Sequence, residues 1–362
     1  MPPVTTRSDL RVCLLLLTVV MGVTFGACKK KSGDSTSTPT SPTPTTTPVT
    51  TPSTTPATST WVSEGARLTN AQVGFSGVLA DTSTLQLKDG RWRMFMFTGN
   101  QYRSAISSDG LSFTMESGER LPVGNGHIRV LRLADDRVRA YFISRSGISS
   151  AVSSDEGVTF VEESGERVNG ASFGASQISG CSIVRTKDGM WRMYFSDLPL
   201  PGAGVSVHRI FSAASADLLS WTPDAGVRIG TGATLSGSGE HPAAYANSDG
   251  SISLFYFRNS NLTLMSANSA DGLTFSTEGS VGLTQANDPD IVRTSSGLRM
   301  YYNWGDNVSG AIYSAVRATA DALYQIAAPR PLFDRRQIER HDDLPVAQKQ
   351  PMPGQRGRSP RN

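Results

Sequence analysis

The sequence predicts an all-β protein, a five-bladed β-propeller whose N-terminal strand closes the last blade. Two observations lead to this prediction. A unit made of an apolar strand, a tight turn and an aromatic strand occurs five times, over residues 81–97, 127–143, 180–196, 241–257 and 288–303. A serine-rich third strand and a fourth short segment follow in most copies, and four short strands per repeat are typical of a propeller blade.

The turns are the strongest local signals within each repeat. Asp89-Gly90 and Asp188-Gly189 each lie between two strand-like runs, and an Asp-Gly pair in that position favours a hairpin. The third strand then ends at an aspartate, whose carboxylate can accept backbone N–H groups across the next turn. These aspartates are Asp109, Asp155, Asp217, Asp271 and, two residues late, Asp321. Residues 153–160 resemble the Asp-box of sialidase-like propellers.

The fourth segment indicates how the ring closes. It follows the first four repeats, no clear copy follows the fifth, and one copy precedes the first repeat at residues 61–68. We therefore expect this N-terminal segment to complete the last blade, which leaves no exposed sheet edge. The propeller is expected to occupy residues 61–333.

Residues 1–28 are typical of a secretory signal peptide. Arg7 and Arg11 flank the start of an apolar run at residues 12–25, which is too short to span a membrane. The run ends in FGAC, which resembles a bacterial lipobox, although its first position departs from the usual leucine. The resemblance implies that Cys28 is lipidated and anchors the protein in the bacterial cell envelope. The outer membrane is favoured because Lys29 follows the cysteine, and an ordinary signal peptide with a chance cysteine is the alternative.

The segments that flank the propeller have unusual compositions. Thr, Ser and Pro supply 25 of the 29 residues from 32 to 60. Such a segment has little apolar surface to bury, so residues 29–60 are expected to form a disordered linker. Residues 334–362 are expected to form a basic disordered tail. The whole chain has a net charge of only +3, so we expect no nucleic-acid partner. The protein is also expected to be a monomer.

The repeat resembles the five-bladed propellers of the superfamily that contains glycoside hydrolase families 43 and 32. The resemblance rests on the strand, Asp-Gly turn and aromatic strand unit and on the Ser-x-x-Ser-x-Asp-Gly ending of the third strand. It implies an oligo- or polysaccharide as the partner. In such propellers the innermost strand of each blade begins at one mouth of the central channel. The first residue of each repeat is therefore expected to face a ligand.

The residues at this mouth position differ between repeats, unlike the framework positions. In order, they are Asp81, His127, Gly180, His241 and Asp288. Glu240 lies beside this column, and Asp290 is expected on the same strand face as Asp288. By resemblance to family 43, Asp81 matches the catalytic base and Glu240 the catalytic acid, because glycoside cleavage needs two carboxyl groups. His127, His241, Asp288, Asp290 and Trp304 are expected to bind substrate.

One departure from the family pattern leaves catalysis open. The family has a third carboxylate in the third blade, where this chain has Gly180. Asp288 or Asp290 would have to supply the missing charge. Otherwise the protein is a non-catalytic propeller that serves as a binding or scaffolding module, and the polar residues of the mouth bind water and loop backbone.

Other chemistries have weaker support in the sequence. The resemblance allows a calcium ion shared by His127, His241 and the aspartates of blades one and five, because some family members hold one in the channel. Arg132, Arg185 and Arg293 share a column, as a sialidase would require, but packing between blades explains them better. Cys181 is the single cysteine of the predicted propeller, and a buried strand thiol is favoured over a nucleophile.

Overall fold

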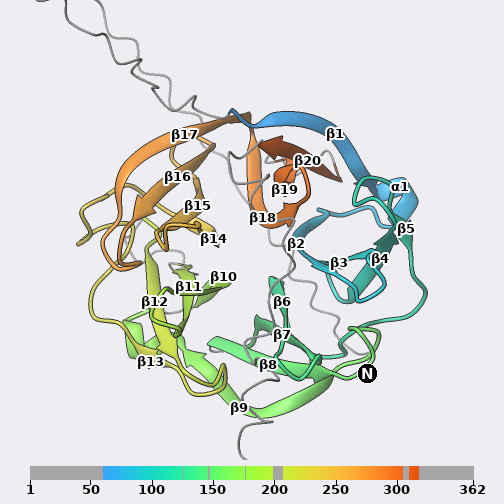
Figure 1. Cartoon of the computed structure of the whole chain (residues 1–362), viewed down its shortest axis with the longest axis horizontal. Helices are drawn as coiled ribbons and strands as arrows, with labels where there is room; N and C mark the ends of the chain where they lie inside the picture. Colours follow the sequence, from blue (N-terminus) through green and yellow to red (C-terminus); the bar gives the residue numbers. More distant parts are fainter. Residues whose placement is uncertain are drawn as a thin grey trace, which may run out of the picture. The chain divides into compact units, whose positions relative to one another are not determined.

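The structure is a computed structural model that describes residues 60–124, 126–145, 147–175, 177–198, 207–304 and 310–317. These residues form five four-stranded antiparallel sheets, which are arranged as blades around a central axis (Figure 1). The predicted five-bladed β-propeller is therefore confirmed. Within the part of the chain that the structure describes, no helix has the length and apolar character needed to cross a membrane.

The first three blades follow one another along the chain, each running from the channel outward. Blade one contains β2 (Ala80–Gln86), β3 (Trp92–Phe97), β4 (Tyr102–Ser107) and β5 (Thr114–Met115). Blade two contains β6 (Ile128–Arg132), β7 (Val138–Ile143), β8 (Gly147–Ser153) and β9 (Val161–Asn169). Blade three contains β10 (Ile178–Arg185), β11 (Trp191–Asp197), β12 (Ile210–Ser215) and β13 (Thr222–Pro223).

The last two blades complete the ring. Blade four contains β14 (Glu240–Ala246), β15 (Ile252–Arg258), β16 (Thr263–Ser269) and β17 (Ser276–Thr284). Blade five contains β18 (Ala286–Thr294), β19 (Gly297–Trp304), β20 (Ala311–Arg317) and, as its outermost strand, β1 (Val62–Thr69). The predicted closure by the N-terminal strand is thus confirmed. Two short helices, α1 (Asn70–Val73) and η1 (Gly170–Phe173), follow β1 and β9.

Buried arginines on the second strands join neighbouring blades. Arg139 forms a fork with Glu163 of its own blade at 2.7 Å and donates to a backbone carbonyl of blade three. Arg299 does the same for the closing blade, because it pairs with Glu64 of β1 and donates to the carbonyl of Asp109 in blade one. The arginines that make these contacts are Arg93, Arg139, Arg192 and Arg299. Their recurrence at the same place in successive blades marks them as framework residues.

The turn aspartates play the structural role expected of them. Asp109 accepts hydrogen bonds from the backbone N–H groups of Leu111 and Ser112, both at 2.8 Å, and from the Ser107 hydroxyl. These bonds, led by that from Ser112, lower the pKa of Asp109 to about 2. The same pattern recurs at Asp155, Asp217 and Asp271. Asp321 lies outside the described residues.

Several other predictions fall on parts of the chain that the structure does not describe. They are the signal peptide with Cys28, most of the linker at residues 29–60, the basic tail, and the side chain of Trp304. Cys181 is described and is fully buried on β10. Burial raises the pKa of its thiol to about 12, so Cys181 is a buried strand thiol rather than an activated nucleophile.

Candidate functional site

A cavity of about 830 Å³ lies at the mouth of the central channel. Among the residues that line it are Asp81, His127, His241 and Asp288, which come from four blades. Each stands where the innermost strand of its blade begins. Asn287 and Asn303 of blade five add two carboxamides to the lining. The cavity therefore gathers polar groups from distant parts of the sequence, as expected of a binding site.

Three of these side chains are presented by the same local structure. The pairing of the first two strands shifts register after Ala80 in blade one, after Glu240 in blade four and after Asn287 in blade five. The residue that follows each shift is in left-handed backbone, with φ of 56° at Asp81, 46° at His241 and 46° at Asp288. Such bulges redirect a side chain, and left-handed backbone is costly for residues other than glycine. Three matching bulges thus turn Asp81, His241 and Asp288 toward one another.

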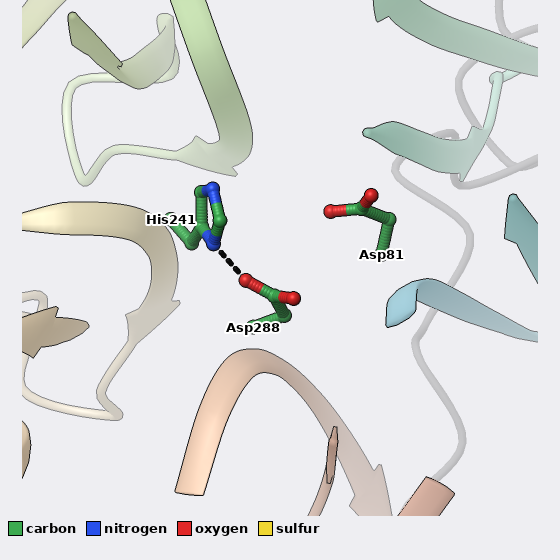
Figure 2. Close-up of side chains that lie close together, drawn as sticks. All are labelled: Asp81, His241 and Asp288. Carbon is green, nitrogen blue, oxygen red and sulfur yellow. Dashed lines mark ion pairs between the residues drawn. The ribbon is translucent and has the colours of Figure 1, made fainter. Parts of the chain in front are cut away.

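The three side chains form a tight cluster (Figure 2). One ligand atom from each lies within 4.8 Å of the others, and Nδ1 of His241 contacts Oδ1 of Asp288. The carboxyl group of Asp81 faces this pair across the cavity. Burial raises the pKa of Asp81 to about 6, although the positive charge of Arg129 acts in the opposite direction. Asp81 is therefore a carboxyl group that holds its proton under mildly acidic conditions.

The two histidines of the mouth are kept neutral. Burial, together with the charges of Arg129 and His241, places the pKa of His127 well below its usual value. Burial and the charges of His208 and Arg129 lower the pKa of His241 to about 4. Their ring centroids are 6.2 Å apart, and Gly180 lies between them. A Cβ at position 180 would approach Cδ2 of both rings to 3.2 Å, so a side chain there would narrow the mouth.

A buried ion pair forms the layer beneath the mouth. Arg129 of blade two and Asp290 of blade five are 2.6 Å apart, and neither is more than 7% exposed. The second carboxylate oxygen of Asp290 accepts the backbone N–H of Thr84 at 2.7 Å. A small cavity of about 110 Å³ surrounds this pair. The ion pair therefore forms a polar floor under the mouth cavity.

Two of the sequence-predicted residues lie apart from the mouth cluster. The carboxylate of Glu240 is 3.1 Å from Nε2 of His208, and Glu240 is not among the cavity's lining residues. Burial raises its pKa, and His208 opposes that rise. Asp290 lies in the lower layer, bound to Arg129. The acid role of Glu240 and the substrate-binding role of Asp290 stay predictions.

Two features of the site were missed by the sequence reasoning. Asn303 is 3% exposed and lines the cavity, and its Oδ1 has no hydrogen-bond partner among the described residues. Arg129 was not singled out either. The signal for Arg129 was present in the repeat, since the residues two positions after the mouth column are Ser83, Arg129, Ser182, Ala243 and Asp290. Arg129 and Asp290 are the only charged residues in that column, and their charges are opposite.

Asp81, His241 and Asp288 are the described residues that can hold a metal ion together. Their donor atoms are two carboxylate oxygens and one imidazole nitrogen. Calcium prefers six to eight oxygen ligands, whereas mixed oxygen and nitrogen donors suit first-row transition metals better. The cluster therefore fits the calcium ion implied by the family resemblance poorly.

The three arginines considered for a sialidase-like site lie elsewhere. Arg132 pairs with Glu156 at 2.6 Å, and Arg293 lies over the ring of Tyr245 at 5.0 Å. Arg185 lies 5.8 Å from the ring centroid of Trp191. None of the three lines the mouth cavity. Their contacts are those of packing within and between blades.

Solved structures of known proteins have a similar architecture. A thermostable family-43 glycoside hydrolase superposes with a TM-score of 0.53 at 14% identity, covering 66% of this chain and 89% of that one. The chain has the five-bladed propeller fold of family-43 glycoside hydrolases. An endo-arabinase from Bacteroides thetaiotaomicron gives 0.53 at 16% identity, covering 67% and 93%. An exo-β-1,3-galactanase from Phanerochaete chrysosporium gives 0.53 at 12% identity, covering 75% and 66%. No protein-family model and no curated protein matches the sequence.

Proposed function

We propose that this propeller binds extracellular carbohydrate in its mouth cavity and cleaves a glycosidic bond there. The observation that carries the proposal is the meeting of Asp81 and Asp288 on matching bulges in one cavity. Glycoside cleavage needs one protonated carboxyl group and one carboxylate. Asp81, with a pKa of about 6, is suited to donate a proton, which would make it the acid rather than the base that the family resemblance implies. Asp288, which contacts His241, is suited to act as the carboxylate.

The solved structures of similar fold support the choice of ligand. Three that superpose with TM-scores of 0.53 are a family-43 glycoside hydrolase, an endo-arabinase and an exo-β-1,3-galactanase. The asparagines of the lining, Asn287 and Asn303, offer both donors and acceptors to sugar hydroxyls. The Oδ1 of Asn303, which has no hydrogen-bond partner among the described residues, is an acceptor that a hydroxyl group can satisfy.

A second candidate is a carbohydrate-binding module without turnover. Two observations favour it: Gly180 stands where the family pattern has a third carboxylate, and Glu240 is engaged by His208 outside the cavity lining. In that case the mouth cavity would bind a sugar and leave its bonds intact.

An activity and binding screen separates these candidates. Arabinan, xylan, mannan, fructan and β-1,3-galactan oligosaccharides would be offered to the wild-type protein and to Asp81→Asn, Asp288→Asn and Glu240→Gln. We expect turnover that falls at least about 100-fold in the first two variants and little in Glu240→Gln. Binding without turnover would establish the second candidate. Loss of turnover in Glu240→Gln alone would restore the acid role to Glu240 and refute our assignment.

The proposal includes attachment to the bacterial cell envelope through Cys28. Its support is the lipobox-like FGAC sequence at residues 25–28 and the Thr/Ser/Pro-rich segment that follows. Replacement of Cys28 by alanine should release the protein from membranes, as measured by fractionation of the producing cells. Equal membrane association of wild type and variant would contradict the anchor.

A further inference from the structure

Arg129 is placed to control the geometry of the mouth. It is the sole arginine in the described part of the chain whose guanidinium lies between four blades of the channel. From blade two it donates to carbonyls of blade one and blade three, and to a carbonyl and a carboxylate of blade five. It is 7% exposed and its charge is compensated by Asp290.

Two of the three carbonyls that Arg129 contacts belong to the bulges that carry Asp81 and Asp288, and the third is that of Cys181 at 3.1 Å. Nη1 donates to the carbonyl of Thr82, the residue after Asp81, at 3.4 Å. Nη2 donates to the carbonyl of Pro289, the residue after Asp288, also at 3.4 Å. The same side chain contacts a third member of the mouth, since Nη2 is 3.2 Å from Nε2 of His127.

Contacts that hold the two bulges together are needed because backbone strain and charge repulsion both oppose their arrangement. Asp81 and Asp288 lie in costly left-handed backbone, and two carboxyl groups this close repel each other when both are charged. Surrounding structure must therefore hold the two bulges together. Arginine suits the task because its planar fork donates in several fixed directions at once, whereas a lysine ammonium is a point charge on a flexible stem.

We propose that Arg129 is the positioning residue of this site: it clamps the bulges that carry Asp81 and Asp288 and so fixes the separation of their carboxyl groups. Asp290 orients the guanidinium and does not itself contact the ligand. The part of this inference that concerns turnover rests on the proposed function, whereas the part that concerns the bulges does not.

The test compares Arg129→Lys with a matched control, Arg139→Lys. Arg139 lies in the same blade, is similarly buried, forms its own ion pair with Glu163 and does not line the mouth cavity. Hydrogen exchange of peptides covering β2 and β18 reports on the two bulges. We expect exchange there to become at least about tenfold faster in Arg129→Lys and to stay unchanged in Arg139→Lys. Because lysine keeps the charge, such a difference identifies the fork as the cause.

A double variant removes Arg129 without leaving a buried charge unpaired, which could unfold the protein. Arg129→Met alone would leave the charge of Asp290 buried without a partner, so Arg129→Met is combined with Asp290→Asn. This variant should also exchange faster in β2 and β18. With the best oligosaccharide of the screen described above, both Arg129 variants should lower kcat by about 100-fold and change KM little, since small misplacements of catalytic groups cost that much.

The outcomes are distinct. Unchanged exchange in β2 and β18 in both Arg129 variants would overturn the clamp, and so would an equal increase in Arg139→Lys. Faster exchange together with an unaltered kcat would show that the bulges do not set the catalytic geometry, and would also overturn the proposal. If the wild-type protein turns over none of the oligosaccharides, the proposed function fails, and the exchange data alone decide whether Arg129 holds the bulges.

Discussion

Replacement of Asp81 by asparagine should stabilise the protein at neutral pH while it removes function. The folded state raises the pKa of Asp81 from 3.8 to about 6, so ionisation of this group opposes folding. Because a raised acid binds more protons in the folded than in the unfolded state, the wild-type protein loses stability as pH rises from about 4 to about 6. Asparagine cannot ionise, and it tolerates the left-handed backbone of position 81 well.

The size of the effect follows from the pKa difference. The shift from 3.8 to about 6, at 1.36 kcal/mol for each unit, corresponds to about 3 kcal/mol. The free energy of unfolding of Asp81→Asn, minus that of the wild type, should therefore increase by about 2 to 3 kcal/mol between pH 4 and pH 7, because part of the effect is already present at pH 4. Urea unfolding followed by tryptophan fluorescence at several pH values measures this difference.

A turn aspartate provides the matched control. Backbone N–H groups of Ser220 and Leu219 lower the pKa of Asp217 to about 2, so its charge favours folding. This stability is present above the unfolded pKa and is lost as pH falls toward 2. Asp217→Asn should be less stable than the wild type by a nearly constant amount above pH 5. If the free energy of unfolding of Asp81→Asn minus that of the wild type is independent of pH, or decreases as pH rises, the burial of an ionisable carboxyl group at the mouth is refuted.

Three further predictions concern ring closure, the mouth and the buried thiol. Glu64→Gln weakens the paired hydrogen bonds to Arg299 that join β1 to blade five. Urea unfolding should show a free energy of unfolding that is lower by about 1–3 kcal/mol, and unchanged stability would contradict this role in closure. Gly180→Ala places a methyl group against the two mouth histidines, so calorimetry should show weaker oligosaccharide binding, and equal affinity would argue against binding there. Cys181 should react with a thiol reagent only after unfolding, because it is fully buried with a pKa of about 12, and rapid labelling of the native protein would contradict that burial.

The blades could be predicted from sequence because their signals are local and repeated. The Asp89-Gly90 turn and the Asp109 turn each depend on a few neighbouring residues, so five similar copies identify the same unit. The closing role of β1 was also predictable. Its segment resembles the fourth strands of the other blades, although it comes before all of them in the sequence. Local patterns of this kind require no knowledge of tertiary contacts.

The geometry of the site could be predicted only in part. The mouth column identified Asp81, His241 and Asp288, because these positions differ where the framework repeats. The register shifts that turn their side chains toward one another depend on pairing with the second strands, and no sequence pattern marked them. The pairing of Arg129 with Asp290 joins residues 161 positions apart in the chain. Such a contact follows from closing the ring, so a strand-by-strand analysis could not find it.

The most direct test of the proposed function is a crystal structure of Asp81→Asn with an oligosaccharide that the screen identifies. The account predicts a sugar ring in the mouth cavity, within hydrogen-bond distance of position 81 and Asp288, with Asn303 contacting a hydroxyl group. A sugar bound on an outer blade surface, with the mouth cavity free of ligand, would contradict it.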